Sequence, residues 1–391
     1  MTHYPYLIIG GGMTGAAAAN AIRERDNAGT IGLISAEPEP PYDRPPLSKK
    51  LWGGKRTVDQ IYIALPGNVQ PMLGRHVVAI DPAARNVTLA DGTSHGYGRL
   101  LLATGGDPRR LPFGGEYVNY YRTLADYRAL RADVDRGARF VVIGGGFIGS
   151  EVAASLRQQG NEVVMVFPEA GISDRLFPAA MTAFLNDYYR EQGVEVLAGE
   201  SVTNIEADAG RATVTLGSGR TLSTDRVVAG IGIVPDVTLA RTASLAIDNG
   251  ILVDENLQTS QPGIYAAGDV ANYPDLILGG RRRVEHADAA RAMGRAAGLN
   301  MAGAGEPYRY LPLFYSDMFD LGYEAVGQCD SRMDIVADWG EPFRHGVLYY
   351  LRDGRVRGVL LMDVWDKVDE ARALIEAGEE VAAADLRGRI Q

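Results

Sequence analysis

The same local pattern occurs twice in this sequence, and the repetition constrains the fold more than any other feature. An apolar run, Tyr6–Ile9, leads into a glycine turn, Gly10–Gly15, and then into an alanine-rich helix. Phe140–Ile143 leads in the same way into Gly144–Gly149 and a second helix. A short buried strand, a GxGxxG turn and a helix together open a dinucleotide-binding βαβ unit. Two copies therefore predict two parallel-sheet nucleotide-binding domains in one α/β chain.

Each glycine turn is expected to hold a pyrophosphate at the start of its helix, where backbone N–H groups and the positive end of the helix dipole point outward. The third glycine of each turn would let the phosphate approach, and the sixth position would let helix pack against strand. The predicted contacts are Gly10, Gly12, Met13, Thr14 and Gly15 in the first turn, and Gly144, Gly146, Phe147, Ile148 and Gly149 in the second.

An acidic residue at the end of the next strand should bind a ribose. Glu37 follows the apolar strand Thr30–Ser35 and fits this role. In the second unit the strand ends at Phe167 and Glu169 lies two positions on, so its role is open between ribose binding and a solvated loop carboxylate. Because no arginine stands at the end of this strand, NADH is favoured over NADPH, although Arg175 could fold back.

A longer pattern further along the chain indicates FAD. The pattern covers Thr259–Asp269 and contains a strand that ends in Gly-Asp, where Asp269 could place its carboxylate against the ribityl hydroxyls of a flavin. Ala103, Thr104 and Gly105 supply another close approach of backbone. One dinucleotide is then FAD and the other NAD(P)H, and we expect the two to meet at a domain interface.

On these motifs the sequence resembles the two-dinucleotide-binding flavoprotein family. Within it, the sequence is similar to ferredoxin reductases of the putidaredoxin-reductase type and to apoptosis-inducing factor, over nearly the whole chain. The residues that carry the resemblance are Gly10–Gly15 with Glu37, Pro41–Lys49, Ala103–Gly105, Gly144–Gly149 with Glu151, Gly230–Gly232, Ile264–Asp269, Arg283–His286, Phe314–Asp317, Leu321–Ala325 and Leu348–Asp353.

The resemblance implies a glutathione-reductase-like architecture, in which two Rossmann-like domains are followed by a C-terminal α+β domain. It implies a discontinuous FAD-binding domain over residues 1–110 and 237–307, and an NAD(P)H-binding domain over residues 111–236. The C-terminal domain, residues 308–391, would cover the flavin.

The resemblance also implies roles for single residues. Lys49 and Glu151 would pair beside the reactive flavin nitrogen, where a cation stabilises the negative charge of reduced flavin. Tyr315 stands where relatives often carry tryptophan, which leaves the electron acceptor open, and His286 could contact the flavin or be structural. The remaining implied contacts are Arg44, Val77, Arg122, Glu285, His286 and Tyr315 for FAD, and Gly232 for NAD.

Composition excludes several classes of function. The net charge of −10 argues against a general nucleic-acid binder, which needs a basic face. Cys329 is the only cysteine, so no disulfide, thiol pair or cysteine-based metal cluster is expected; we predict no metal site, and interpret Cys329 as a small buried residue. The start, Met1–Tyr6, lacks the features of a secretion signal, and all apolar runs are of strand length. We therefore expect a cytoplasmic protein without a membrane span.

The predicted activity is that of an FAD-dependent oxidoreductase, which takes hydride from NADH and passes electrons to a ferredoxin, a rubredoxin, a Rieske protein or a quinone. A disulfide reductase is excluded because residues 38–51 contain no cysteine. Arg281–Arg283 could dock an acidic partner or form a solvated basic loop. Two rival functions stay open: a slow, apoptosis-inducing-factor-like redox sensor with NADH-controlled dimerisation, and a monodehydroascorbate-type reductase.

Overall fold

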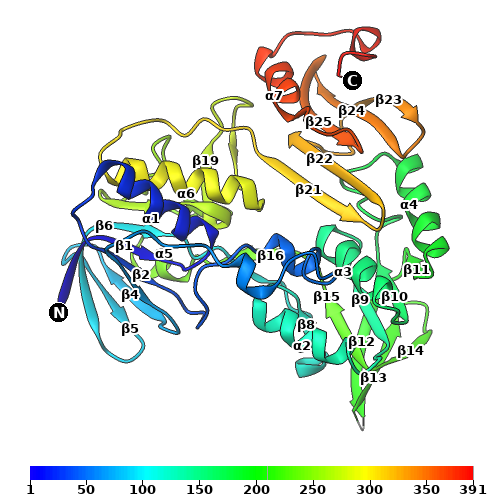
Figure 1. The fold of residues 1–391 in the computed structure, drawn as a ribbon, viewed down its shortest axis with the longest axis horizontal. Helices are drawn as coiled ribbons and strands as arrows, with labels where there is room; N and C mark the ends of the chain where they lie inside the picture. Colours follow the sequence, from blue (N-terminus) through cyan, green and yellow to red (C-terminus); the bar gives the residue numbers. More distant parts are fainter. Residues whose placement is uncertain (209, 391) are drawn as a thin grey trace. The chain divides into compact units, whose positions relative to one another are not determined.

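A computed structural model describes residues 1–208 and 210–390 of the chain, which divides into two compact units (Figure 1). The first unit comprises Met1–Asp43, Val58–Asp107 and Val234–Pro312, and the second comprises Arg44–Thr57, Pro108–Ile233 and Leu313–Gln391. Each unit contains one of the two βαβ patterns. The boundaries of the FAD, NAD(P)H and C-terminal domains predicted from the sequence remain a proposal.

The first unit is organised around a seven-stranded sheet in the order β3-β2-β1-β6-β5-β4, with β18 also paired to β6. Its centre is parallel, because β1 (Thr2–Ile9) pairs in parallel with β2 (Ile31–Ile34) and β6 (Ser94–Leu102). The ends of these strands are continuous apolar runs because they are buried on both faces. The other strands are β3 (Val69–Met72), β4 (Val77–Asp81), β5 (Asn86–Leu89) and β18 (Ile264–Ala266).

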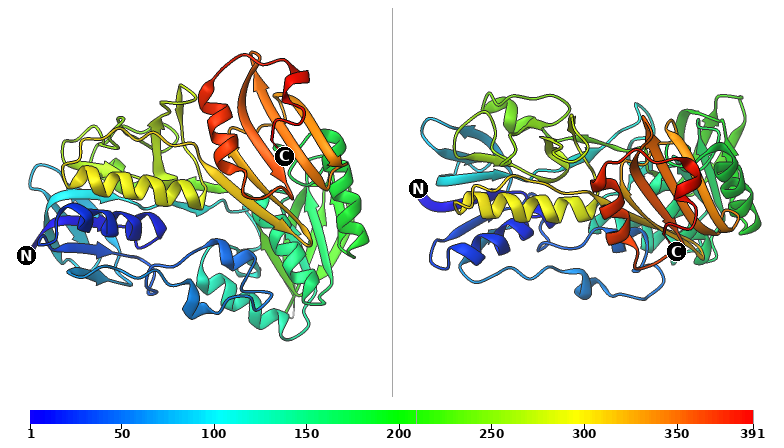
Figure 2. Two further views of the ribbon diagram at one scale, coloured as in Figure 1. Left: turned by 45° about the horizontal axis from the view of Figure 1, so that its top comes forward. Right: turned by 90° about the horizontal axis from the view of Figure 1, so that it is seen from above.

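Two long helices of the first unit, α1 (Met13–Arg25) and α6 (Ala287–Met301), lie side by side (Figures 1 and 2). The helices approach closely because α6 has glycines at the contact: a Cβ atom on Gly294 would lie 2.3 Å from the carbonyl oxygen of Thr14, and one on Gly298 would lie 2.4 Å from that of Ala18. The unit also contains α5 (Thr238–Thr242) and a small sheet of β17 (Ile251–Leu252), β19 (Ala271–Pro274) and β20 (Arg281–Arg282). The short strands β7 (Gly106–Pro108) and β16 (Ile233–Pro235) pair with each other.

The second unit contains a five-stranded parallel sheet in the order β11-β10-β9-β15-β8. Its strands are β8 (Val118–Tyr120), β9 (Phe140–Ile143), β10 (Val163–Phe167), β11 (Glu195–Ala198) and β15 (Arg226–Ala229). Its helices are α2 (Leu124–Val134), α3 (Phe147–Gln158) and α4 (Ala179–Glu191). An antiparallel sheet of β12 (Val202–Asp208), β13 (Arg211–Leu216) and β14 (Thr221–Thr224) completes this region.

The second unit ends in a five-stranded antiparallel sheet in the order β21-β22-β25-β24-β23, against which α7 (Val368–Ala377) packs. The strands are β21 (Leu313–Met318), β22 (Leu321–Gly327), β23 (Asp334–Glu341), β24 (His345–Arg352) and β25 (Arg355–Met362). The large side chains Tyr323, Tyr349 and Tyr350 are fully buried in this sheet. The predicted fold class, two parallel nucleotide-binding patterns followed by an α+β region, is confirmed.

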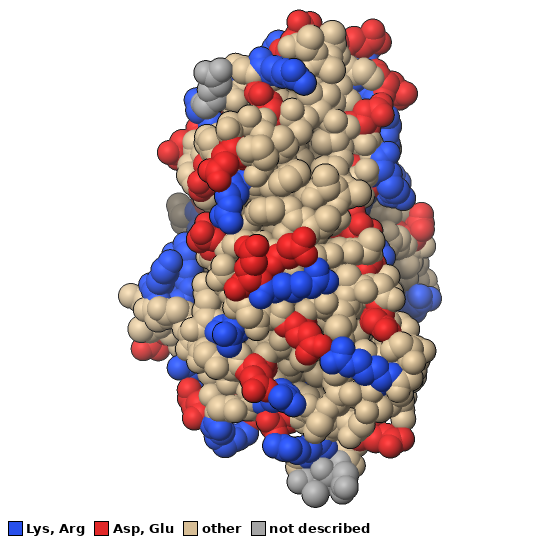
Figure 3. Space-filling view, turned by 90° about the vertical axis from the view of Figure 1, so that its right-hand side faces the viewer, with Lys and Arg blue, Asp and Glu red and all other residues tan. Residues whose placement is uncertain are grey.

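Lysine, arginine, aspartate and glutamate side chains are interspersed on the face drawn in Figure 3. Among the ion pairs of the second unit are Arg190–Asp187 and Arg220–Glu195. Within the described part of the chain, every helix is too short or too polar to cross a membrane.

Candidate active site

The two glycine turns have the same geometry. Gly10 has φ +121° and Gly144 has φ +110°, which are values that side chains rarely adopt. A Cβ atom on Gly15 would lie 2.0 Å from the carbonyl oxygen of Gly10, and a Cβ atom on Gly149 would lie 1.9 Å from that of Gly144. Each helix start is therefore pressed onto its own turn, as the sequence predicts.

The third glycine of each turn leaves an open cradle at the start of a helix. Gly12 and Gly146 precede the first residues of α1 and α3, and a Cβ atom on either would meet no other described atom within 4 Å. The first N–H groups of a helix have no acceptor within the helix, and both first turns lack acidic side chains. Phe147 and Ile148 are 36% and 39% exposed, so a ligand can reach the second cradle. Both cradles fit the pyrophosphate of a dinucleotide.

The two predicted ribose-binding acids have different surroundings. Glu37, after β2, accepts a hydrogen bond of 2.6 Å from the hydroxyl of Tyr42. Glu169, after β10, is one-third exposed and lies 3.8 Å from the guanidinium of Arg175, whose side chain is 92% exposed. The Arg175 side chain is therefore turned to solvent and only loosely paired, which leaves the Glu169 carboxylate accessible.

The Gly-Asp pattern of the first unit lies on a short 3-10 helix, Gly268–Val270, directly after β18. Arg283 holds this segment, because it donates to the carbonyl oxygen of Asp269 at 3.0 Å and pairs with Glu285 at 2.6 Å. His286 is partly buried at the start of α6, and burial lowers its pKa to about 4 despite the nearby carboxylates of Asp269 and Asp288. The His286 imidazole is therefore neutral at pH 7.

The remaining predicted contacts lie in separate segments. Thr14 is buried at the start of α1, and Val77 is partly buried at the start of β4. Thr104 donates to the carbonyl oxygen of Asp236 at 2.8 Å, which fixes the segment Ala103–Gly105 after β6. In the second unit Gly232, with φ +89°, accepts a backbone hydrogen bond from Arg109.

Lys49 and Glu151 form a buried ion pair in the second unit. The Lys49 Nζ atom lies 2.7 Å from Glu151 Oε1, and the two side chains are 8% and 3% exposed. Glu151 is in α3, next to the second cradle, whereas Lys49 follows a 3-10 helix, Pro45–Ser48. Two serine hydroxyls also donate to the carboxylate, from Ser48 to Oε2 at 2.5 Å and from Ser316 to Oε1 at 2.6 Å. Three donors from two segments of the chain therefore converge on one carboxylate.

Hydrogen bonds also fix the loop that carries Lys49. Ser155 of α3 donates to the carbonyl oxygen of Ser48 at 2.8 Å, and the Tyr121 hydroxyl donates to that of Leu47 at 2.5 Å. Burial raises the pKa of Tyr121 well above its usual value, so this phenol stays a neutral donor. Arg44 and Arg122, two predicted FAD contacts, lie next to this loop. The guanidinium of Arg44 donates to the carbonyl oxygen of Arg122 at 2.9 Å.

Tyr315 lies beside the ion pair. Its ring centroid is 5.1 Å from Lys49 Nζ, within the range of a cation–π contact. Tyr315 is 40% exposed, whereas the next residue of β21, Ser316, is 1% exposed. Successive residues of a strand point to opposite faces, so β21 presents an aromatic ring on one face and a hydroxyl to the carboxylate on the other.

Comparison with known proteins identifies the family. Residues 4–294 match the family described as pyridine nucleotide-disulphide oxidoreductase. The chain belongs to this family. Residues 297–342 also match the C-terminal region of apoptosis-inducing factor, described as mitochondrion-associated. The resemblance stated from the sequence motifs is confirmed.

Relatives of this oxidoreductase include an apoptosis-inducing factor and ferredoxin reductases, and also monodehydroascorbate reductase 3 from Arabidopsis thaliana, which is 34% identical over 92% of this chain and 89% of the relative. The chain is 36% identical to apoptosis-inducing factor 1 from Dictyostelium discoideum, over 95% of this chain and 78% of the relative. It is 37% identical to the ferredoxin reductase subunit of 5,5'-dehydrodivanillate O-demethylase from Sphingobium sp., over 97% of this chain and 95% of the relative. The solved covalent complex of putidaredoxin reductase with putidaredoxin matches with a TM-score of 0.92 and 30% identity, over 99% of this chain and 96% of that one.

Sequence reasoning missed two residues of this oxidoreductase that contact Glu151. Ser48 and Ser316 both lie in segments that carry the family resemblance, but no pattern assigned either a role. For Ser316 a signal was present: β21 alternates exposed and buried residues from Tyr315 to Met318, and a buried polar residue in such a strand needs a hydrogen-bond partner. Ser48 gave no comparable signal, because polar residues are common in proline-rich loops.

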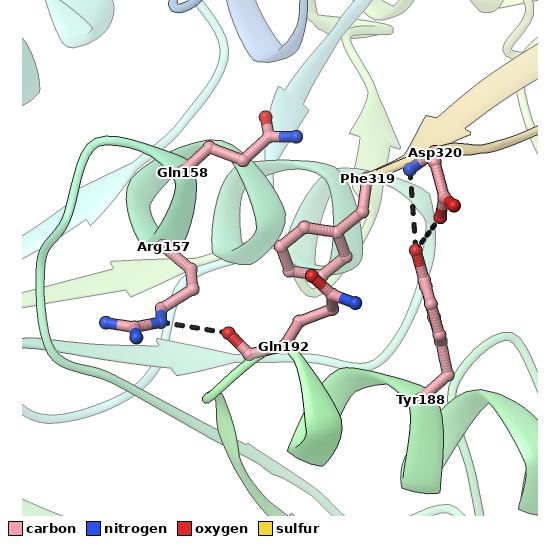
Figure 4. Close-up of a pocket in the computed structure, with 6 residues that line it drawn as sticks. All are labelled: Arg157, Gln158, Tyr188, Gln192, Phe319 and Asp320. Carbon is pink, nitrogen blue, oxygen red and sulfur yellow. Dashed lines mark hydrogen bonds between the residues drawn. The ribbon is translucent and has the colours of Figure 1, made fainter.

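A separate hollow of about 470 Å³ lies at the other end of α3 (Figure 4). It is lined by Arg157, Gln158, Tyr188, Gln192, Phe319 and Asp320. Its polar groups bond one another, because Arg157 donates to the carbonyl oxygen of Gln192 and Tyr188 donates to the carboxylate of Asp320. Arg157 is in the last turn of α3, which at 1.5 Å per residue is roughly 15 Å from the glycine turn. This hollow is therefore not the dinucleotide cradle.

The basic segment Arg281–Arg283 and the thiol of Cys329 were both singled out in the sequence, and both interact with other parts of the protein. The arginines of Arg281–Arg283 bond backbone carbonyl oxygens or carboxylates of the first unit, including a 2.8 Å ion pair from Arg282 to the buried Asp275. Burial raises the pKa of the Cys329 thiol far above its usual value, so the thiol stays protonated. These placements favour the structural interpretations of both features.

Proposed function

We propose that this oxidoreductase takes hydride from NADH onto FAD and delivers the electrons to a small iron–sulfur protein of the ferredoxin type. The observation that carries the proposal is the buried Lys49–Glu151 pair, which adjoins the second glycine cradle and is held by two serine hydroxyls. Family membership supports FAD and a nicotinamide nucleotide as the two cofactors. The names of ferredoxin reductase relatives and the solved complex with putidaredoxin support the class of acceptor.

The proposal assigns a role to each group of residues. The first cradle, with Glu37 and Asp269, binds FAD, and the second cradle, with Glu169, binds NADH. When bound, FAD supplies the chemistry, because it accepts a hydride and releases electrons singly. Lys49 supplies a positive charge that favours reduced flavin, and Glu151 holds Lys49 in place. Hydride transfer needs no protein nucleophile, so the main contribution of the chain is to orient the reactants.

The nucleotide preferred is NADH. Glu169 follows β10, where its carboxylate can accept hydrogen bonds from ribose hydroxyls and would repel a 2′-phosphate. Arg175 is solvent-exposed and does not mask this carboxylate. A cytoplasmic location and the three-domain boundaries belong to the same proposal and rest on sequence reasoning.

Disulfide reduction is not proposed, although the name of the family includes it. Cys329 is the only cysteine of the chain, and its buried thiol is held in the protonated, unreactive form. A dithiol mechanism needs a second cysteine, which this sequence does not contain.

The proposal is tested with the purified protein under anaerobic conditions. We expect a yellow protein whose visible flavin band bleaches within seconds of adding NADH, and more slowly with NADPH. Bleached protein should then reduce a [2Fe–2S] ferredoxin. A colourless protein that cannot be loaded with FAD, or a flavin band that neither nucleotide bleaches, would refute the proposal.

A second candidate is a slow redox sensor that dimerises when reduced by NADH. The match of residues 297–342 to the C-terminal region of apoptosis-inducing factor, together with the relative of that name, favours it. The two candidates differ in the fate of the reduced protein. Slow reoxidation by ferredoxin and by oxygen, with a doubling of mass on gel filtration after NADH addition, would replace the reductase proposal.

A further inference from the structure

Glu151 has a hydrogen-bond environment that the redox pair alone does not require. Its Oε1 atom accepts from both Lys49 Nζ and Ser316 Oγ, and its Oε2 atom accepts from Ser48 Oγ. All three donors lie within 2.7 Å of the carboxylate. Hydrogen bonds to a charged group are stronger than those between neutral groups. Together the three bonds fix both the position and the rotation of the carboxylate.

Ser316 differs from the other two donors in its origin. Ser48 and Lys49 are adjacent in one loop, whereas Ser316 is in β21, at the edge of the C-terminal sheet. Ser316 is 1% exposed, and a buried hydroxyl without a partner is costly. The contact with Glu151 satisfies that hydroxyl and links the edge of this sheet to helix α3.

The same strand carries Tyr315, whose ring contacts Lys49. Tyr315 and Ser316 therefore reach opposite members of one ion pair, the aromatic ring touching the cation and the hydroxyl bonding the anion. A shift of β21 would disturb both contacts together. The position of Lys49 thus depends on β21 as well as on Glu151.

We infer that Ser316 is a positioning residue for electron transfer, whose hydroxyl orients Glu151 so that Lys49 and Tyr315 are held together at the reacting site. The inference deepens the proposed function and rests on it for the statement that Lys49 acts on the flavin. Ser316 itself touches neither nucleotide in this account; it acts through the Glu151 carboxylate.

Among the groups around Glu151, the Tyr323 hydroxyl is the nearest substitute for Ser316, because it interacts with the Ser316 hydroxyl and makes no other hydrogen bond in the described structure. Two buried tyrosines, Tyr189 and Tyr323, lie close enough for the Glu151 charge to add to burial in raising the pKa of each well above its usual value. Tyr189 already donates to the carbonyl oxygen of Ser150 at 3.1 Å. Loss of the Ser316 hydroxyl would leave Lys49 and, of these two phenols, only Tyr323 to donate to Glu151 Oε1, and would draw the ammonium toward the carboxylate.

The test is a double-mutant cycle on the FAD-loaded protein with Ser316→Ala, Glu151→Gln and the combination. Two quantities are measured: the rate constant of flavin reduction by NADH in stopped flow, and the midpoint potential of the flavin in a chemical reductant titration. We expect Ser316→Ala to slow reduction by roughly tenfold, the effect of one hydrogen bond to a charged group, and to shift the potential to a more negative value. The dissociation constant of NADH should change by less than about threefold.

The cycle separates positioning from a general packing defect. If Ser316 acts through Glu151, its replacement should have little further effect in the Glu151→Gln background, so that the two changes are non-additive. Thr224→Val is a matched control, because it removes another buried hydroxyl of the second unit: Thr224 ends β14 and donates to the backbone carbonyl oxygen of Arg139. This control should leave the rate and the potential unchanged.

Two results would overturn the inference: a wild-type rate and potential in folded, FAD-loaded Ser316→Ala, or effects of Ser316→Ala and Glu151→Gln that simply add. Failure of the proposed function looks different. If NADH does not reduce the flavin of the wild-type protein, the reductase proposal fails, while the potential titrated with a chemical reductant still reports whether Ser316 and Glu151 are coupled.

Discussion

Replacing Lys49 with methionine should destabilise this protein far more than the loss of an ordinary ion pair. Methionine keeps the length of the apolar stem but removes the ammonium, and Glu151 remains 3% exposed with a charge that has lost its partner. Breaking a buried pair by removing one member typically costs about 3–5 kcal/mol. Ser48 and Ser316 still donate to the carboxylate in this variant, so we expect the lower end, about 3 kcal/mol.

A second substitution shows whether the stranded charge is the cause. Glu151→Gln in the Lys49→Met background removes the remaining charge and keeps an oxygen that can accept from a serine hydroxyl. Because neutral groups of similar volume often replace a buried ion pair at little cost, the double variant should recover most of the lost stability, to within about 1 kcal/mol of wild type. Among wild type, Lys49→Met and the double variant, Lys49→Met should therefore be the least stable, because it alone keeps an unpaired charge on Glu151.

The assay is thermal unfolding of the FAD-loaded proteins, followed by circular dichroism and flavin fluorescence. For domains of 150–250 residues a change of 1 kcal/mol shifts the midpoint by roughly 2–4 °C, so Lys49→Met should lower it by roughly 6–12 °C. The control is Lys367→Met, which breaks the 2.8 Å pair between Lys367 and Glu370, whose side chains are 31% and 50% exposed. Exposed pairs contribute about 0–1 kcal/mol, so the control should shift the midpoint by less than about 4 °C. A double variant no more stable than Lys49→Met would refute the reasoning.

Three further predictions concern the cradles and the thiol. Gly149→Ala should lower the unfolding midpoint, because its Cβ would lie 1.9 Å from the Gly144 carbonyl oxygen. Gly146→Ala, whose Cβ meets no described atom within 4 Å, should unfold like wild type but bind NADH at least about tenfold more weakly. Equal unfolding midpoints for the two variants would contradict this. Glu169→Ala should raise the KM for NADH and narrow the preference over NADPH in steady-state assays, and an unchanged preference would remove Glu169 from the ribose site. Cys329→Ser should retain ferredoxin reduction. Iodoacetamide should not inactivate the folded wild-type protein, because burial raises the pKa of the Cys329 thiol. Rapid inactivation of the wild type that Cys329→Ser abolishes would show a functional thiol.

The framework of the fold was readable from the sequence because its signals are local. The apolar run Phe140–Ile143 is a strand with those bounds, and a helix follows its glycine turn as the pattern predicts. Strand β6, Ser94–Leu102, has a clear apolar signal only in its second half. Its first half contains glycines and polar residues, and backbone pairing with β1 and β5 holds it in the sheet despite that composition.

The site was only partly readable, because its contacts join segments far apart in the chain. A pattern around Lys49 contains no information about Glu151, and the family resemblance supplied that pairing. The serine hydroxyls were missed because serine has no strong preference for a buried site. The grouping of Arg44–Thr57 with the second compact unit, where Ser155 and Tyr121 bind the loop, also depends on contacts between distant segments.

The Lys49–Glu151 pair is difficult to explain by stability alone. A well-packed apolar pair of similar volume would be about as stable, since removing two charges from water costs several kcal/mol for each ion. The protein nevertheless directs two hydroxyls at Glu151 and places the ring of Tyr315 against Lys49. Each of these contacts fixes the position of a charge and adds little apolar burial. A cation that must stand at a defined point beside an electron-accepting ring requires such an arrangement, whereas a cation that only fills space does not. The double variant Lys49→Met, Glu151→Gln should therefore be nearly as stable as wild type and yet slow in flavin reduction.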